Sequence, residues 1–224
     1  MKSERLFKIV QYCEVAEVVA DIGCDHGLVS AELIQRKIAG KVIAADISGE
    51  SLKKAEELAE RLGMENQIEC RLGDGLSVLK PGEAQGIIIA GMGGPLLMRI
   101  LEQGWKVARN ACYLVLSPHN YPDSVRQYLN LAGFCIEKEE ISREKGKFYP
   151  IMKARLGREA AYSPLEKLVG RNVLKNEEWR EYVRHEVEVQ KFISAQAGDS
   201  PAGQKAREKI ALYEQALLES KKEE

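Results

Sequence analysis

The sequence predicts an α/β fold, in which a Rossmann-like, doubly wound parallel sheet is followed by a helical hairpin. Short apolar runs alternate with helical patterns up to about residue 116, and most of these runs end at a glycine or an acid. This alternation implies right-handed crossovers, which make neighbouring strands parallel. From residue 163 onward the pattern is helical and no strand is predicted.

The first part of the chain is predicted to supply the sheet and its covering helices. Strands are predicted at residues 17–20, 41–45, 68–72, 86–90 and 113–116. Helices are predicted at residues 1–12, 28–38, 51–62, 96–101 and 124–132. Residues 86–90 are apolar throughout, which favours a central strand buried on both faces. Residues 134–142 and 148–154 are expected to close the sheet edge as an antiparallel pair.

The tail is predicted to fold as helices at residues 165–174, 177–195 and 204–220. The last two each carry one narrow apolar seam, which is typical of an antiparallel hairpin of coiled-coil type. We therefore divide the chain into a first domain, residues 1–157, and a helical coiled-coil domain, residues 158–224. The tail pattern leaves two roles open: packing or dimerisation, and contact with a large substrate.

Composition limits the classes of function. The 224 residues carry a formal net charge of −1, which argues against a protein that holds nucleic acid by bulk charge but leaves room for a local basic patch. No signal peptide and no apolar run long enough to span a bilayer is found. The five cysteines lack metal-binding spacing. We expect a cytoplasmic protein that binds neither membrane nor metal. The sequence does not determine the oligomeric state, for which a monomer is our expectation.

The segment Asp21-Ile-Gly-Cys-Asp-His-Gly27 follows the first predicted strand and opens a helix. A glycine at this turn lets the backbone approach a nucleoside cofactor closely. A dinucleotide site would read G-x-G-x-x-G, with a pyrophosphate at the helix N-terminus. Here the third glycine is missing and Asp25 would repel a pyrophosphate. The loop therefore favours a cofactor with a cationic amino-acid end, S-adenosylmethionine.

Three further strand ends carry matching residues. Asp46 lies where an acid can accept hydrogen bonds from ribose hydroxyls. Asp74 is placed to accept from the adenine amino group, and the turn at residues 91–94 lets a substrate approach the methyl group. Together the four strand ends predict a class I methyltransferase sheet, in which the cofactor-binding residues are Asp21, Gly23, Asp25, His26, Gly27, Asp46, Ile47, Asp74, Gly75, Gly91, Met92 and Gly93.

The chain also resembles the TrmK family of bacterial tRNA adenine-N1 methyltransferases. The matching segments are Val19-Ala-Asp-Ile-Gly-Cys-Asp-His-Gly27, Arg71-Leu-Gly-Asp-Gly-Leu76, Ile89-Ala-Gly-Met-Gly-Gly94 and Gly146-Lys-Phe-Tyr149, and the helical tail matches as well. The resemblance implies S-adenosylmethionine as cofactor, tRNA as partner and methylation of adenine N1 at tRNA position 22. It also implies that the tail is a coiled-coil domain.

Methylation of adenine N1 needs no strong base, because this ring nitrogen has its own lone pair. Catalysis then depends on orientation and on a carboxylate that favours the developing positive charge. We assign the charge-stabilising role to Asp25, while His26 orients the base or moves a proton. Residues predicted to contact the substrate are Arg5, His119, Asn120, Lys147 and Tyr149, of which Asn120 and Tyr149 complete the catalytic set. Tyr149 is a candidate for stacking on an extruded base, and Arg5 and Lys147 for phosphate contacts.

Three alternatives remain beside this hypothesis. A methyltransferase of the same fold can act on another RNA or a small molecule. A non-catalytic RNA-binding protein can retain the cofactor fold, although the presence of all the strand-end acids argues against this. A nicotinamide-dependent oxidoreductase is disfavoured by the missing glycine and by Asp25.

Overall fold

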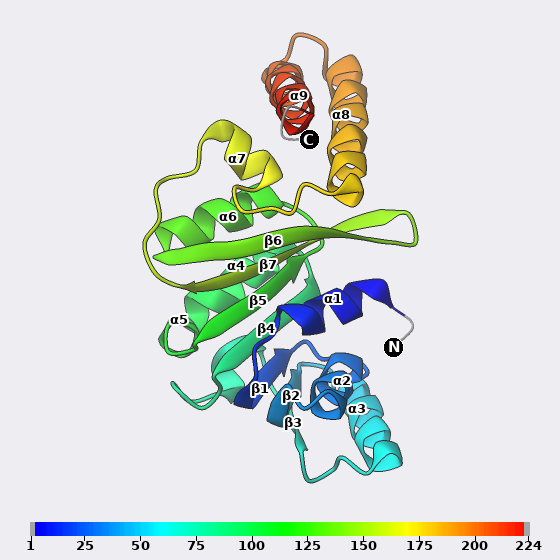
Figure 1. Cartoon of the computed structure of the whole chain (residues 1–224), viewed down its shortest axis with the longest axis vertical. Coiled ribbons are helices and arrows are strands. Elements are labelled where there is room, and N and C mark those ends of the chain that lie inside the picture. The colour runs from blue at the N-terminus through cyan, green and yellow to red at the C-terminus, as the bar shows by residue number, and fades with distance from the viewer. Residues whose placement is uncertain (1–2, 222–224) are drawn as a thin grey trace.

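The computed structural model describes residues 3–221, and within them a seven-stranded sheet lies between two layers of helices (Figure 1). The strand order is β3-β2-β1-β4-β5-β7-β6. Parallel pairing joins the first five strands in the chain, β1 (Ala16–Ile22), β2 (Ala39–Asp46), β3 (Ile68–Leu72), β4 (Gly86–Met92) and β5 (Tyr113–Pro118). The order reverses between β1 and β4, and ligands of such sheets bind at the carboxyl ends of the strands near this point.

The closing strands form the predicted antiparallel pair. β7 (Lys147–Leu156) pairs with β5 and with β6 (Phe134–Glu144), in both cases antiparallel. β4 lies between β1 and β5, and Ile87, Ile88 and Ile89 are all fully buried. The prediction that residues 86–90 form a central strand is therefore confirmed.

Each face of the sheet has its own buried core. Helices α1 (Glu4–Tyr12), α2 (Leu28–Gln35) and α3 (Gly49–Leu62) cover one face. Helices α4 (Gly94–Gln103), α5 (Trp105–Ala108) and α6 (Pro122–Leu131) cover the other, together with the 3₁₀ turn η1 (Gly75–Val78). The short elements α5 and η1 were not predicted. Of the predicted first helix, residues 1 and 2 lie outside the described residues, and α1 begins after Ser3, whose hydroxyl accepts a hydrogen bond from the Leu6 N–H.

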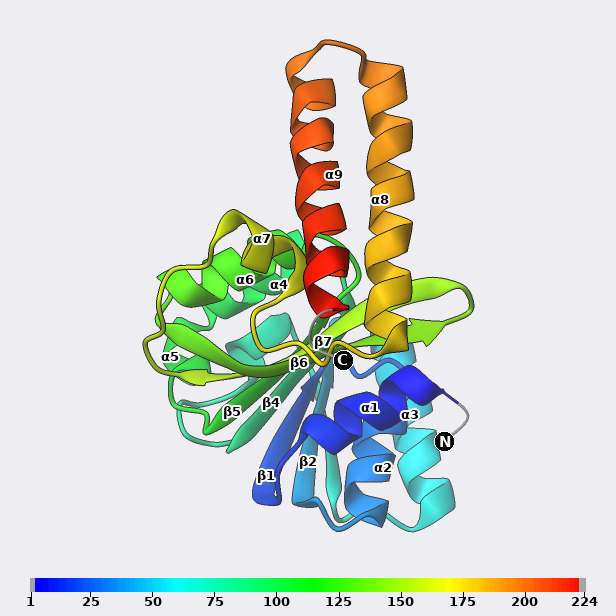
Figure 2. The ribbon, with the colours of Figure 1, turned by 45° about the horizontal axis from the view of Figure 1, so that its top comes forward.

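The helical hairpin consists of α8 (Glu177–Ala197) and α9 (Pro201–Ser220), which run side by side away from the sheet (Figure 2). The predicted seam is buried at Trp179, Val183 and Val187 of α8 and at Ala206 and Tyr213 of α9. The base of the hairpin packs against β6 and against α7 (Pro164–Val169) in a third apolar core. In residues 3–221, no helix combines the length and hydrophobicity needed to cross a membrane.

The predicted helix at residues 165–174 is wrong beyond Val169. Gly170 takes a φ of +85°, and the chain then turns back along β6. The Glu139 N–H donates to the Asn172 carbonyl and the Leu174 N–H donates to the Glu139 carbonyl, each at 2.9 Å. Val173, which extends the helical pattern, is thus buried in a strand-like segment beside β6. The division of the chain after residue 157 stays a prediction, although Tyr162, beyond that point, is buried in the core of α4–α6.

Candidate active site at the carboxyl edge of the sheet

Two glycines shape the turn that follows β1. Gly23 has a φ of +74°, and a Cβ placed there would lie 2.5 Å from the Met92 side chain at the end of β4. Gly27 has a φ of +68°, and its Cβ would lie 2.9 Å from the Ala55 Cβ on α3. Both positions combine a backbone conformation that L side chains rarely adopt with a close contact. The turn therefore packs closely against Met92 and Ala55, and neither glycine position has room for a side chain.

Asp21 lies beneath this turn rather than in it. Its side chain is 4 % exposed, and one carboxyl oxygen accepts a 2.7 Å hydrogen bond from the Ser30 hydroxyl. Burial raises the pKa of Asp21 to about 6, and the nearby Asp46 carboxylate adds to the rise, while the hydrogen bonds from Ser30 oppose it. At neutral pH the carboxyl is mostly ionised, so a buried negative charge lies under the loop.

Asp46 joins the ends of β1 and β2. Its Oδ2 accepts from the Asp25 N–H at 3.1 Å, and its Oδ1 accepts from the Ser48 N–H at 2.9 Å. These two bonds fix the carboxylate and tie the glycine turn to the second strand. Asp25 itself has a φ of +50°, and its side chain is 75 % exposed, with the His26 ring 3.5 Å away.

A cavity of about 320 Å³, here called the first cavity, opens between these loops and α4. Its walls include most of the predicted cofactor residues: Gly23, Asp25, Asp46, Ile47, Asp74, Gly75, Gly91 and Met92. Asp21, His26, Gly27 and Gly93 do not line it. Prediction missed Leu96, Arg99 and Ile100, which come from one face of α4. Their position just after the glycine turn at the end of β4 was the signal that could have revealed them.

The charged side chains that line the first cavity fit S-adenosylmethionine. Its lining contains three carboxylates, from Asp25, Asp46 and Asp74, and one cationic side chain, from Arg99. This excess of negative charge favours a ligand with a sulfonium and an ammonium group and opposes a pyrophosphate. Among residues 3–221, no group of three or more His, Cys, Asp or Glu side chains is arranged to hold a metal ion.

The segment that follows β5 is tied to the end of β4. The Gly94 N–H donates to the Asn120 Oδ1 at 2.9 Å, and the His119 N–H donates to the Met92 carbonyl at 2.9 Å. A Cβ at Gly94 would lie 2.6 Å from the Asn120 carbonyl oxygen, so the two turns are in direct contact. This contact places His119 and Asn120 beside the wall of the first cavity.

Three of the predicted substrate residues, Arg5, His119 and Tyr149, contact one another although they are distant in sequence. The Arg5 guanidinium donates to the His119 Nε2 at 3.2 Å and lies 4.6 Å from the centre of the Tyr149 ring. The rings of His119 and Tyr149 meet edge to face at 5.4 Å. Burial lowers the pKa of His119, and Arg5 and Lys147 add to this effect. The ring is therefore neutral at pH 7, and because Nε2 accepts from Arg5, its proton lies on Nδ1.

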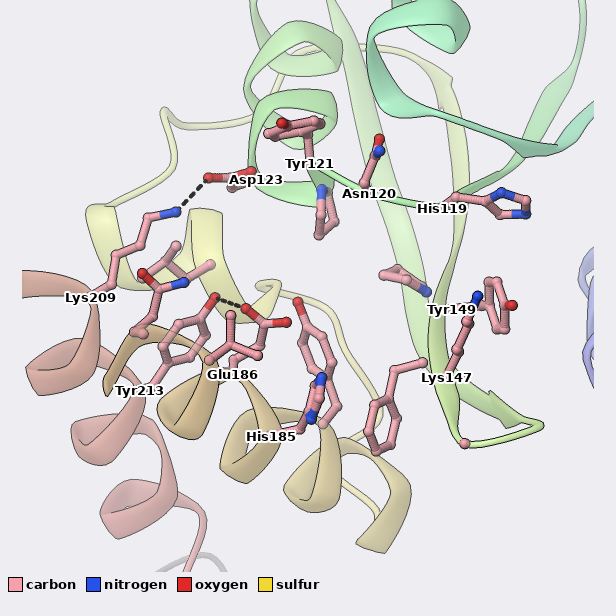
Figure 3. A pocket seen from close by; sticks show the side chains of 18 residues that line it. His119, Asn120, Tyr121, Asp123, Lys147, Tyr149, His185, Glu186, Lys209 and Tyr213 are labelled. Carbon is pink, nitrogen blue, oxygen red and sulfur yellow. Dashed lines mark hydrogen bonds and ion pairs between the residues drawn. The ribbon is translucent and has the colours of Figure 1, made fainter. Parts of the chain in front are cut away.

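A larger cavity of about 650 Å³, here called the second cavity, lies between this segment and the helical hairpin (Figure 3). His119, Asn120, Lys147 and Tyr149 line its sheet side. The opposite side is formed by α8 and α9, with Tyr182, His185, Glu186, Lys209 and Tyr213. None of these helix residues was predicted to belong to a site, because only the tertiary fold brings the hairpin over the sheet edge.

Comparison with known proteins identifies the family. Residues 2–152 match a family model described as a methyltransferase domain. The chain is 32% identical to the tRNA (adenine(22)-N(1))-methyltransferase of Bacillus subtilis (strain 168), and the match covers 92% of this chain and 91% of that relative. The chain belongs to the TrmK family of tRNA adenine-N1 methyltransferases.

Two solved structures of similar proteins share the architecture of nearly the whole chain. The crystal structure of Bacillus subtilis TrmK has a TM-score of 0.85 and 28% identity, covering 96% of this chain and 98% of that one. A Streptococcus pneumoniae protein in complex with S-adenosyl-L-methionine has a TM-score of 0.88 and 29% identity, covering 97% and 100%. The predicted TrmK membership, the Rossmann-like methyltransferase fold with its helical tail and the methyltransferase activity are confirmed.

Proposed function

We propose that this enzyme transfers a methyl group from S-adenosylmethionine to N1 of the adenine at position 22 of tRNA. Beyond the family, the observation that carries the proposal is the first cavity, where the glycine turn and the fixed Asp46 carboxylate meet the segment at His119 and Asn120. We infer that the cofactor and the target base meet at this junction. We further propose that the enzyme works in the cytoplasm as a monomer.

Different residues of the first cavity would bind different parts of the cofactor. S-adenosylmethionine, when bound, supplies a methyl group activated by its sulfonium. Asp46 would accept hydrogen bonds from the ribose hydroxyls, since its carboxylate is fixed in place by two backbone N–H groups. Asp74 and Gly75 would hold the adenine end, and Asp25, with the buried Asp21 beneath it, would attract the cationic amino-acid end.

The target adenine would lie against His119, Asn120 and Tyr149. The Gly94 N–H donates to the Asn120 Oδ1 and fixes the amide, and the amide N–H₂ has two donors that can contact the base. The Tyr149 ring is held by His119 and Arg5, which gives it a fixed face for stacking. A base must leave its helix to reach such a site, and stacking offsets part of the cost of that step.

The chemical step needs orientation and charge stabilisation. Adenine N1 can accept a methyl group without first losing a proton, and the methylated ring carries a positive charge. Asp25 is the exposed carboxylate of the first cavity nearest the glycine turn, so it is our candidate for stabilising that charge. His26, whose ring lies 3.5 Å from the Asp25 carboxylate, would orient the base or move a proton.

We predict that Asp25→Asn lowers kcat by about 100-fold, the range typical for loss of one electrostatic contact to a transition state. Asparagine tolerates a positive φ as aspartate does, so the turn should keep its shape. Steady-state methylation and calorimetric titration with the cofactor would measure kcat and Kd separately. A kcat within threefold of wild type would remove this role from Asp25.

The function itself is tested with two tRNA transcripts that differ only in having adenine or guanine at position 22. The enzyme should transfer labelled methyl from S-adenosylmethionine to the first transcript and not to the second. Digestion and chromatography of the product should give 1-methyladenosine. Labelling of neither transcript, with cofactor binding intact, would move the substrate to another RNA or to a small molecule.

A further inference from the structure

We propose that the second cavity binds a second nucleobase of the RNA substrate, one whose ring edge donates hydrogen bonds to Glu186. The inference rests on the proposed function, because it assumes an RNA at this edge of the sheet. It adds a specificity subsite that the target adenine does not occupy. The cavity encloses about 650 Å³ and is lined on opposite sides by the sheet edge and the hairpin (Figure 3).

The subsite lies on the hairpin side of the second cavity, and the residues proposed to hold the target adenine line its sheet side. The first cavity shares no lining residue with the second cavity, and His119 and Asn120 line the second cavity alone. Glu186 and Tyr213 project from the hairpin, across the second cavity from His119 and Asn120 (Figure 3). We therefore assign the base at Glu186 as a second base, distinct from the target adenine on the sheet side.

Aromatic rings give the second cavity the flat surfaces that bind a base. The Phe148 ring lies 5.5 Å from the His185 ring and 5.9 Å from the Tyr182 ring. Phe148 is half-buried, with the Arg143 guanidinium 5.7 Å from the centre of its ring, and His185 is exposed, so solvent reaches this aromatic cluster. Stacking on such rings is the common way in which proteins hold an unpaired base, and it tolerates any base.

The charged groups on the hairpin side of the second cavity favour a base edge that donates hydrogen bonds. Lys209 is paired with Asp123 at 3.4 Å, so its charge is already compensated. Within residues 3–221, the Glu186 carboxyl receives one hydrogen bond, from the Tyr213 hydroxyl at 3.4 Å. A second carboxyl oxygen is thus left to accept from an amino or ring N–H group, as acidic side chains do with base edges. Burial raises the pKa of Glu186, and Asp123 adds to the rise while His185, Lys209 and Tyr213 oppose it.

Two variants test the subsite, each with a matched control. Glu186→Gln removes an acceptor, and Phe148→Leu removes a stacking face but keeps an apolar side chain. Each should raise the KM for the position-22 adenine transcript by about tenfold, within the range given by one base–aromatic stack or one charged hydrogen bond. The kcat and the Kd for S-adenosylmethionine should stay within twofold of wild type. Glu188→Gln and Phe192→Leu, exposed positions on α8, should leave the KM unchanged.

Fluorescence locates the second base directly. 2-Aminopurine is placed, one position at a time, on either side of the target nucleotide. Binding to wild type should change its fluorescence at one position, and Phe148→Leu should abolish the change. A KM within twofold of wild type in both subsite variants overturns the proposal while leaving the proposed function in place. Failure of wild type to methylate the transcript overturns the proposed function and the subsite with it.

Discussion

Replacing Glu139 with glutamine is expected to lower the free energy of unfolding by about 3–5 kcal/mol, the cost of leaving a buried charge without its partner. The side chains of Arg126 and Glu139 are 0% and 1% exposed, and Arg126 Nε donates to Glu139 Oε2 at 2.9 Å. The neutral amide would keep one hydrogen-bond acceptor but remove the negative charge. The Arg126 guanidinium, which is never deprotonated in proteins, would remain buried in the same place.

The loss should extend beyond local stability because the pair joins three elements. Arg126 lies on α6, Glu139 lies on β6, and the Arg126 Nη1 also donates to the Lys167 and Leu168 carbonyls at the end of α7. This end of α7 packs with the base of the hairpin in the third core. We therefore expect Glu139→Gln to disturb the hairpin side of the second cavity and to weaken tRNA methylation more than cofactor binding.

Urea unfolding followed by tryptophan fluorescence would measure the change, since Trp179 is buried in the core beside this pair and donates to the Val169 carbonyl. Glu137→Gln is the control, because Glu137 lies on the same strand and is 37% exposed in its pair with Arg155. Exposed pairs contribute about 0–1 kcal/mol. Equal and small losses in the two variants would show that the buried pair contributes no more than a surface pair.

Local patterns were sufficient to predict the sheet and to bring most of the predicted cofactor residues to its carboxyl edge. The apolar runs, the glycine turn at Gly23 and the acids at Asp46 and Asp74 are each contained in a few consecutive residues, so the sequence shows them directly. The prediction of a helix at residues 165–174 was wrong beyond Val169 because it too relied on a pattern within a few consecutive residues. Val173 continues an apolar helical pattern, but it packs beside β6, and Gly170 ends the helix before it. A local pattern shows that a side chain is buried without showing which element buries it.

The hairpin side of the second cavity could not be predicted, because it depends on contacts across the whole chain. Glu186 and Tyr213 look like ordinary residues of a charged, amphipathic hairpin until the fold places them opposite Asn120. Arg5, His119 and Tyr149 were each candidates for substrate contact, but nothing in the sequence joined them into one cluster. Their catalytic and binding roles stay predictions until variants are measured.

Asp21→Asn is expected to stabilise the protein at neutral pH and to weaken cofactor binding. The folded-state pKa of Asp21, about 6, lies above its ordinary value of 3.8. Folding therefore takes up a proton between about pH 4 and pH 6, and the stability due to this group falls as the pH rises through that window. A shift of about two units corresponds to roughly 3 kcal/mol. The free energy of unfolding of the variant should thus equal that of wild type near pH 4 and exceed it by up to about 3 kcal/mol at pH 7.5.

Binding should change in the opposite direction, because the ionised Asp21 lies under the loop that would hold the cationic end of S-adenosylmethionine. We expect the Kd of the cofactor to rise about tenfold at pH 7.5, the size of one charged interaction. Urea unfolding at pH 4.5 and pH 7.5 and calorimetric titration would measure both effects, with the exposed Asp199→Asn as control. A variant less stable than wild type at pH 7.5 would show that the hydrogen bonds from Ser30 outweigh the cost of burying the charge. A stabilised variant with unchanged cofactor affinity would instead show that the buried charge does not act on the ligand. Both effects together would mean that the fold tolerates an unfavourable buried charge because binding requires it.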